Sequence, residues 1–219
     1  MRTNTPNAVV ARPSVAAIVF LVLTCAAAGA RADQTGDAAE STSRPCYVGT
    51  SLFTLMNLAP DDQPPRFYQL NIGYQLTPKD RLSVEAITWR YYHPLGIPWG
   101  EEGRESSDKA YPGHVREAGV GLEYQRSLTK GLYSSVSAIP FWRGYYDTQN
   151  EKIGNGLQLY LTARVGYHVG VSDRLFLEPS VAFNYWPVST NVPDSFAAQD
   201  KRWPSYFLFE PGLNVGFRF

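Results

Sequence analysis

Cysteine is scarce in this sequence, with two residues among 219. Cys25 lies in an apolar run near the N-terminus that we expect to be removed, which leaves Cys46 in the mature chain. A single thiol cannot form a disulfide within its own chain. We therefore predict a fold that needs no disulfide, with Cys46 as a small packing residue at the start of the first strand.

Long apolar runs are missing too, apart from residues 15–30. This run follows Arg2 and Arg12 and leads into Ala30-Arg31-Ala32, the pattern of a secretory signal peptide. Residues 1–32 are predicted to be the cleaved signal. The small and polar residues 33–45 are predicted to be a flexible periplasmic tail. Since no other stretch approaches the length of about 18 apolar residues, no helical membrane span is expected.

A net charge is also absent, because 20 Lys and Arg residues balance 20 Asp and Glu residues. Loss of the signal would remove Arg2, Arg12 and Arg31, leaving 17 basic residues against 20 acidic ones. Such a chain offers no basic surface to a nucleic acid, so no nucleic-acid partner is expected.

The sequence is rich instead in alternating apolar and polar residues. The last fourteen residues, 206–219, carry an apolar side chain at every second position: Phe207, Phe209, Pro211, Leu213, Val215, Phe217 and Phe219. Small or polar residues lie between them, with Leu208 as the exception. A period of two over this length predicts a β-strand with one apolar face. A terminal strand of this kind leaves an exposed edge unless the sheet closes into a barrel.

Seven further segments predict strands, at residues 47–56, 67–76, 81–92, 115–126, 132–145, 157–169 and 174–186. Tight connections at 77–80, 129–131 and 170–173 alternate with longer ones at 57–66, 93–114, 146–156 and 187–205. Short turns on one side and long loops on the other are typical of an outer-membrane barrel. The predicted fold class is therefore all-β: an eight-stranded antiparallel up-and-down transmembrane β-barrel over residues 46–219, with both termini periplasmic.

A soluble lipocalin-like barrel also alternates, but its apolar face points inward around a ligand. Here the polar face mixes acids, bases and glycine and has no lysine in mid-strand, which suits a narrow filled lumen. Seven residues are predicted to form a lumen charge network: Glu85, Glu117, Glu123, Arg164, Glu178, Glu210 and Arg218. Buried charges need partners, and we expect Arg164 and Arg218 each to neutralise a glutamate, with Glu178 and Glu210 as the favoured partners.

Aromatic residues make up 14% of the chain and gather towards the predicted long loops. An aromatic girdle belongs at a membrane interface. The residues expected in an outer girdle are Trp89, Tyr91, Tyr92, Trp142, Tyr145, Tyr146, Tyr185, Trp186, Trp203 and Tyr206.

In its strand pattern and its ending Val215-Gly216-Phe217-Arg218-Phe219, the segment 46–219 resembles the small eight-stranded bacterial outer-membrane proteins typified by OmpA, OmpX and OmpW. The glycine spacing of the usual terminal signal is shifted here. The resemblance implies a cell outer-membrane location in a Gram-negative envelope, contact with outer-membrane lipid and lipopolysaccharide, and assembly by the barrel-insertion machinery reading Phe217 and Phe219. It fixes no activity, because one fold hosts many functions. A monomer without a cofactor is expected.

His93 and His114 bracket the second long connection and form a weak candidate site at the barrel mouth. Two imidazoles near carboxylates could bind a divalent metal or act as general bases. More often, such histidines are solvated loop residues. The His-Ser pair of the lipid A deacylases is missing, so no catalytic residue and no metal site are predicted.

Three functions remain open on the sequence alone. The first is a non-enzymatic outer-membrane barrel that contributes to envelope integrity or surface interaction, with its lumen filled by the Glu/Arg network. The second is a porin-like transport barrel for small or apolar solutes, as in the OmpW-like group. The third is a lipid A-modifying outer-membrane enzyme.

Overall fold

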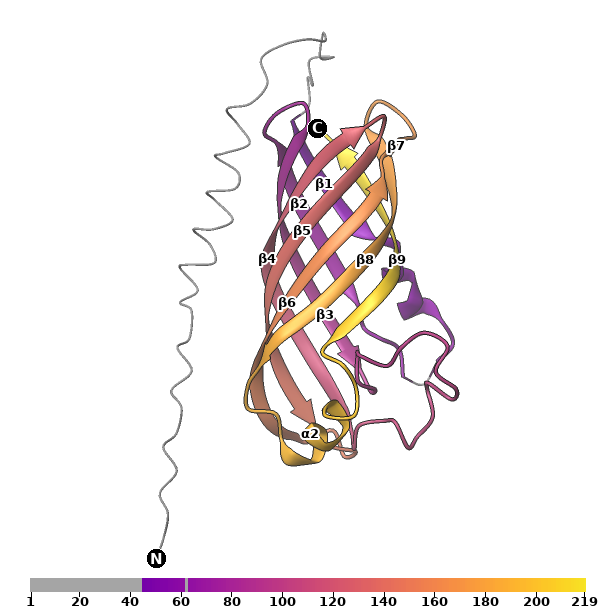
Figure 1. Ribbon diagram of the computed structural model, residues 1–219, viewed down its shortest axis with the longest axis vertical. Helices are drawn as coiled ribbons and strands as arrows, with labels where there is room; N and C mark the ends of the chain where they lie inside the picture. The colour runs from indigo at the N-terminus through magenta and orange to yellow at the C-terminus, as the bar shows by residue number, and fades with distance from the viewer. Residues whose placement is uncertain (1–44, 62) are drawn as a thin grey trace, which may run out of the picture. The chain divides into compact units, whose positions relative to one another are not determined.

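The computed structural model describes residues 45–61 and 63–219, which form an antiparallel β-barrel (Figure 1). The predicted signal peptide and nearly all of the predicted tail lie outside the described residues. The strands are β1 (Cys46–Ser51), β2 (Tyr68–Gln75), β3 (Asp80–Tyr91), β4 (His114–Thr129), β5 (Leu132–Tyr146), β6 (Lys152–Tyr167), β7 (Val169–Gly170), β8 (Leu175–Ser189) and β9 (Tyr206–Arg218). Two short helices, η1 (Leu52–Leu58) and α2 (Asp194–Asp200), complete the elements. No helix in this described part is long and apolar enough to cross a membrane.

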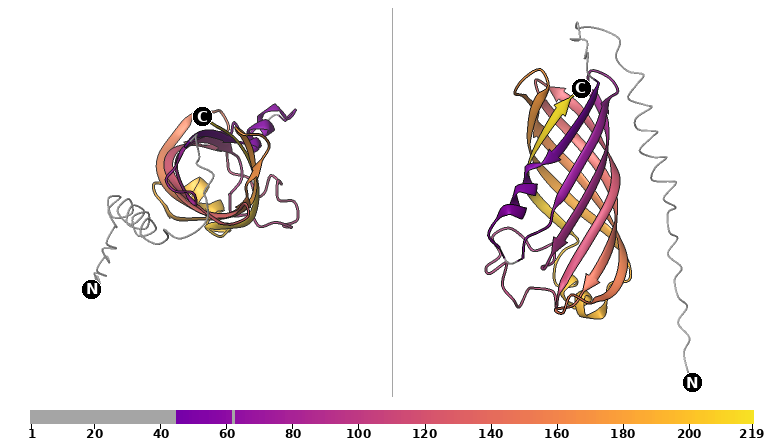
Figure 2. Two further views of the ribbon diagram at one scale, coloured as in Figure 1. Left: turned by 90° about the horizontal axis from the view of Figure 1, so that it is seen from above. Right: turned by 180° about the vertical axis from the view of Figure 1, so that it is seen from behind.

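Hydrogen bonds run around the whole ring. The sheet order is β6-β5-β4-β3-β2-β1-β9-β8-β7, and an additional β6–β8 pairing closes it (Figure 2). β6 and β7 are interrupted only at His168, and both pair with β8, so together they act as one strand. The barrel ring therefore has eight strands, counting β6 and β7 as one, as the alternating pattern predicts.

Alternation decides which side chains face out. In β2, Tyr68, Leu70, Ile72 and Tyr74 are 46–57% exposed, whereas Asn71 between them is 7% exposed. Further exposed apolar residues lie on the other strands, including Val84, Val120, Val136, Leu157, Val165, Tyr185, Leu213 and Phe217. The polarity is thus inverted relative to a soluble protein, with apolar side chains outside and charges inside.

Three tight connections define one end, which we call the turn end. Thr77 and Asp80 close the β2–β3 turn through Asp80 N–H to Thr77 Oγ1, at 3.0 Å. Lys130 and Gly131 make the β4–β5 turn with φ of 39° and 89°, a conformation that glycine adopts without steric cost. The opposite end, which we call the mouth, carries the connections 52–67, 92–113, 147–151 and 190–205.

One predicted long loop is short. Instead of residues 146–156, the connection spans 147–151, because β5 continues to Tyr146 and β6 begins at Lys152. Asp147 makes this possible: its Oδ1 accepts from the N–H groups of Gln149 and Glu151 at 2.9 and 2.8 Å. The turn chemistry of Asp147 thus replaces the loop that the weak alternation of residues 146–156 predicted.

The first strand is also shorter than predicted, ending at Ser51 rather than at residue 56. Ser51 accepts the N–H of Phe53 on its side chain at 3.2 Å and starts η1, which lies outside the ring wall (Figure 2). Four apolar side chains of η1, on Phe53, Leu55, Met56 and Leu58, are 45–81% exposed.

This early end leaves the ring incomplete near the mouth. β1 pairs with β9 only from Ser51↔Asn214 to Tyr47↔Arg218. Within the described residues, no strand therefore pairs with this edge of β9 from Tyr206 to Leu213. The connection 92–113 covers part of the edge, where the Trp99 indole N–H donates to the Phe209 carbonyl at 3.2 Å.

Part of the predicted phase of the last strand is wrong. The β8–β9 register shifts between Ala182 and Asn184, and Phe209 has φ of 60°. This bulge inverts the facing on its mouth side. Phe207 is consequently 6% exposed and packs against Trp99, at 5.2 Å between ring centroids, while Leu208 is 44% exposed.

The predicted aromatic girdle needs a similar correction. Trp142, Tyr185 and Tyr206 do face outward, at 47–60% exposure. Tyr91 and Tyr145, however, are 6% and 0% exposed and belong to a core inside the mouth. Nearness to a loop did not distinguish the inward from the outward side of each strand.

Candidate functional site

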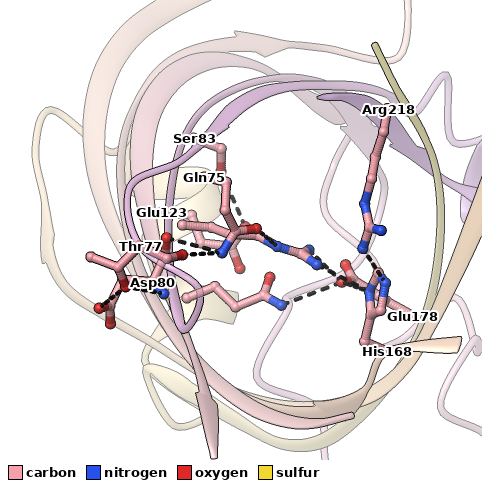
Figure 3. A network of polar contacts seen from close by, with 10 residues as sticks. Gln75, Thr77, Asp80, Ser83, Glu123, His168, Glu178 and Arg218 are labelled. Atoms are coloured by element: carbon pink, nitrogen blue, oxygen red, sulfur yellow. Dashed lines mark hydrogen bonds and ion pairs between the residues drawn. The ribbon is translucent and has the colours of Figure 1, made fainter. Parts of the chain in front are cut away.

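Charged and polar side chains fill the lumen at the turn end. Glu178 on β8 lies at the centre: Arg81 Nη1 and His168 Nδ1 approach its Oε1 at 2.8 and 2.7 Å (Figure 3). Gln125 donates to the same oxygen at 3.3 Å. Arg81 and Glu178 are 5% and 6% exposed. Side chains from β3, β4 and the break between β6 and β7 thus meet on one buried carboxylate of β8.

The rest of this cluster surrounds Arg81 and His168. Gln75 accepts from Arg81 Nε at 3.0 Å. Arg218 donates to His168 Nε2, and Tyr47 and Phe176 flank the Arg81 guanidinium at 5.5 Å from each ring centroid. We call the six residues Gln75, Arg81, Gln125, His168, Glu178 and Arg218 the turn-end cluster.

The predicted pairing of Glu178 with Arg164 is therefore wrong. Glu178 forms its ion pair with Arg81 on β3, not with Arg164 on the neighbouring β6. Arg164 donates to Ser180 Oγ at 2.9 Å instead. Arg218 donates to His168, and the charge of Glu178 also acts on Arg218. The prediction considered only adjacent strands, but a lumen this narrow lets side chains meet across the bore.

The middle of the lumen holds three carboxylates. Glu85 accepts from Gln69 at 3.2 Å, and Glu123 accepts from Ser83 Oγ at 3.4 Å. Glu210 accepts from Asn184 at 2.5 Å. The positive charge of Arg164 acts on both Glu85 and Glu210, and that of Arg104 also acts on Glu210. The predicted network residues on this level thus share the lumen, mostly through neutral hydrogen-bond donors.

Towards the mouth lies a second buried ion pair. Arg143 Nε is 2.8 Å from Glu117 Oε1, and the two side chains are 2% and 0% exposed. The Tyr91 hydroxyl donates to the same Glu117 oxygen at 2.7 Å and accepts from Arg143 Nη2 at 2.5 Å. Each member therefore contacts the other two, which fixes their orientation.

A helix and a hydrophobic cluster cap this pair. The cluster consists of Tyr91, Tyr111, Val115, Tyr145 and Phe196. Phe196 lies on α2 and is fully buried. Tyr111 donates its hydroxyl to Asp200 at the end of α2. Burial raises the pKa of Tyr111 well above its ordinary value, and the negative charge of Asp200 raises it further. The hydroxyl therefore stays protonated and holds α2 over the mouth.

His93 and His114 do not form a shared site. His93 Nδ1 is 3.5 Å from Glu105 in the loop. His114 stacks on Tyr146, at 5.0 Å and 4° between the rings, and its Nε2 accepts from Arg116 Nε at 3.1 Å. Among the described residues, no group of three or more His, Cys, Asp or Glu side chains is placed to hold a metal ion.

Sequence reasoning missed two central residues, Arg81 and Arg143. Arg81 lies an even number of residues from Glu85, so alternation along β3 would have placed it in the lumen. Arg143 lies on β5, where the lumen face also carries large apolar residues: Ile139 and Phe141 are in phase with Arg143 and are 3% exposed each. For Arg143, no periodic signal was available.

Comparisons with known proteins show a structural likeness. No protein-family model matches the chain, and no curated protein matches it. A solved structure of a major outer membrane protein from Thermus thermophilus aligns with a TM-score of 0.47 and 13% identity, covering 80% of this chain and 98% of that one. At this similarity no activity or ligand is transferred from that protein.

Proposed function

We propose that this chain is a non-enzymatic integral outer-membrane β-barrel that contributes to envelope integrity and presents its mouth for surface interaction. The observation that carries the proposal is the inverted polarity of a closed antiparallel ring. Exposed apolar side chains cover its outer wall, while Glu117, Glu178, Arg81 and Arg143 are buried inside. In water the outer wall would be a continuous exposed apolar surface, whereas in a membrane the apolar lipid chains would cover it.

The filled lumen supports a structural role rather than an open pore. An eight-stranded barrel is just wide enough for its interior to be filled by side chains. Here the turn-end cluster, the three middle carboxylates and the Arg143–Glu117 pair occupy successive levels. Ordered polar networks of this kind rigidify a barrel when their members are satisfied.

The proposed location also determines which partners we expect. Outer-membrane lipid and lipopolysaccharide would contact the apolar wall. The barrel-insertion machinery would read the last strand, where Phe217 and Phe219 are 41% and 58% exposed. The ring satisfies its own edges at the turn end, which supports a monomer.

Membrane fractionation tests the location. The protein is expected in the detergent-resistant outer membrane, with a mobility on gels that changes on boiling, as a stable barrel unfolds only when heated. Recovery as a soluble periplasmic protein would overturn the proposal.

The unpaired edge of β9 favours transport as a second candidate. Between Tyr206 and Leu213 the wall is closed by loop contacts, such as Trp99 to Phe209, rather than by a strand. Movement of the connection 92–113 would open a lateral path for small apolar solutes. Planar-bilayer recording and liposome uptake decide between the candidates. A plugged barrel stays near baseline, and a steady open conductance would put transport first.

A further inference from the structure

Three arginines lie close together on the outer side of the wall near the mouth. Arg90 on β3 lies directly opposite Arg116 on β4 in the register of the two strands. The Arg90 N–H donates to the Pro65 carbonyl at 2.7 Å, so the end of the connection 52–67 runs beside Arg90. Arg66 follows Pro65, and its positive charge acts on Arg90, as that of Arg116 does. We call Arg66, Arg90 and Arg116 the arginine row.

The arginine row has no acidic counterpart in the part of the chain that the structure describes. None of its three members forms an ion pair with a described Asp or Glu side chain. The charged groups that act on His114, the next outward residue of β4, are the same three arginines. Like charges directly opposite one another on neighbouring strands are destabilising. The arrangement therefore suits an anion lying against the outer wall.

The guanidinium of Arg116 is held in place but is still reachable. It lies 4.4 Å from the centroid of the Tyr146 ring, and its Nη2 donates to Asn150 Oδ1 at 2.8 Å. Arg116 is half-buried and Arg66 is exposed, whereas Arg90 is 8% exposed. An anion at the surface would therefore contact Arg116 and Arg66, with Arg90 as a fixed positive charge behind them.

The arginine row marks the mouth-side edge of the apolar band. On β4, the outward positions between Arg116 and Arg126 are Ala118, Val120, Leu122 and Tyr124. Ten residues of strand separate the two arginines. At about 3.3 Å a residue and a tilt of about 40°, this is about 25 Å along the barrel axis, the usual height of a lipid-facing band. Arg126, at the other edge, is neutralised by Asp80 at 2.9 Å, so only the mouth-side edge carries unmatched positive charge.

The position of the arginine row indicates which anion to expect. The long connections of outer-membrane barrels face outward, so the proposed location puts the mouth at the outer leaflet, where lipopolysaccharide is the lipid. Its lipid A part carries phosphate monoesters, each with a charge of about −1.5 to −2 near pH 7. Arginine forms strong charge-assisted hydrogen bonds to phosphate. A phosphodiester carries a single negative charge, so a monoester is the better match for three arginines.

We propose that Arg66 and Arg116 bind a phosphate group of lipid A at the outer-leaflet interface, with Arg90 supplying a third positive charge behind them. This deepens the proposed function and rests on it for the identity of the lipid. Fractionation tests the location and binding in micelles tests the arginine row, so the two proposals can fail separately.

The test is thermal unfolding of the full barrel in lauryldimethylamine oxide micelles, whose headgroup carries no phosphate, with and without added lipid A. A ligand that binds the folded state raises the unfolding temperature, so the increase on adding lipid A reports binding. Lipid A from which the phosphate groups have been removed should give a much smaller increase. Calorimetric titration with the same two lipids measures the affinities.

Three variants separate the arginine row from a general effect of charge. Arg116→Gln should weaken lipid A binding about 10- to 100-fold, the effect of one hydrogen bond between charged groups. Arg66→Gln should weaken it as well, and this residue is exposed on a connection, so its variant keeps the barrel folded. Arg174→Gln is the matched control: it removes one exposed positive charge at the turn end and should bind lipid A as the wild type does.

Four results would overturn the proposal. One is that lipid A binds equally well without its phosphate groups. Another is that Arg116→Gln and Arg66→Gln both bind lipid A as tightly as the wild type, or that Arg174→Gln loses as much affinity as they do. The third is that inorganic phosphate binds as tightly as lipid A, because the row would then hold a free anion. The fourth is that phosphatidylglycerol binds more tightly than lipid A.

Discussion

The turn end and the mouth of this barrel are closed and filled in different ways. At the turn end β1 pairs with both neighbours, and the side chains around Glu178 engage one another. At the mouth β1 has already ended, loops cover the β9 edge, and α2 caps the lumen. In the described part of the chain, all nine buried side-chain atoms without a hydrogen-bond partner belong to residues of the mouth half, although one of them, Arg143 Nε, is in ion-pair contact.

The difference indicates that the two ends have different roles. Satisfied buried networks hold a structure rigid, and unsatisfied buried groups are costly unless a water or ligand meets them. The turn end is thus built for stability. The mouth half retains buried polar atoms without a hydrogen-bond partner, most of them on the paired strands β3 to β6. Four predictions test this contrast, in decreasing order of the change in stability that we expect.

Breaking the Arg81–Glu178 pair should change the stability most. Arg81→Ala leaves a buried carboxylate without its ion-pair partner and should destabilise the barrel by about 3–5 kcal/mol, whereas Arg81→Ala with Glu178→Ala should recover part of the loss. Denaturant unfolding of the single and double variants in micelles measures the coupling. Arg164→Ala with Glu178→Ala is the control and should be closer to additive. Equal coupling in both cycles would contradict the pairing seen here.

The facing of β6 comes next. Leu161 lies opposite the outward-facing Tyr185 in the β6–β8 register. Thr162, on the other face of β6, donates a hydrogen bond to the lumen residue Asn184 at 2.9 Å. Arginine at mid-membrane on the lipid face costs about 2–4 kcal/mol. Leu161→Arg should therefore impair folding into bilayers far more than Thr162→Arg, whose charge can approach Glu210 within the lumen. Equal folding yields for the two variants would mean that the lipid face is assigned wrongly.

The Tyr111–Asp200 contact predicts a pH effect at the mouth. The pKa of Tyr111 is raised in the folded state well above its ordinary value of 10.0. Above pH 10.0 the unfolded chain releases its proton first, so the stability falls as pH rises towards the folded-state pKa, by at most about 1.4 kcal/mol per pH unit. Tyr111→Phe should unfold with a shallower pH dependence than the wild type. Parallel stability curves for the two proteins on either side of the ordinary tyrosine pKa would rule out this role.

Two tyrosines provide the most direct comparison between the two ends. The Tyr145 hydroxyl at the mouth is buried without a partner, whereas Tyr124 at the turn end donates to Asp80 at 2.6 Å. Tyr145→Phe should be neutral or slightly stabilising, because it removes an unsatisfied group. Tyr124→Phe should cost about 1.5–3 kcal/mol before discounting for its partial exposure, since its acceptor is charged. Similar losses for both would show that the Tyr145 hydroxyl has a partner after all.

Much of the architecture was predictable because a period of two needs no tertiary information. The outward faces of β2 and β8 follow directly from residues such as Leu70, Ile72, Val181 and Phe183. The prediction failed where alternation is interrupted. The bulge at Phe209 reverses the facing of Phe207, and the side chain of Asp147 shortens a loop, so neither follows from hydrophobic pattern alone.

The candidate site was less predictable than the fold. Glu178 and Glu117 could be placed in the lumen by their phase, but not their partners. The Arg81–Glu178 pairing across the bore depends on the strand tilt and on the length of the Arg81 side chain, whereas Arg143 lies directly opposite Glu117 on the adjacent strand. His93 and His114 have different partners, His93 lying near Glu105 and His114 stacking on Tyr146, which the sequence did not indicate.

The barrel and its inverted polarity follow from local sequence: alternation sets which side chains face out, and turn residues such as Gly131 set where the chain reverses. Three features depend instead on the folded arrangement of the whole chain. These are the stretch of β9 that no strand pairs with, the choice of partners among buried charges, and the polar atoms at the mouth that remain without partners. The cause of this split is the range of the interactions. Strand periodicity and turn chemistry act between residues close in sequence, while Arg81 and Glu178 are 97 residues apart and meet only after the ring closes.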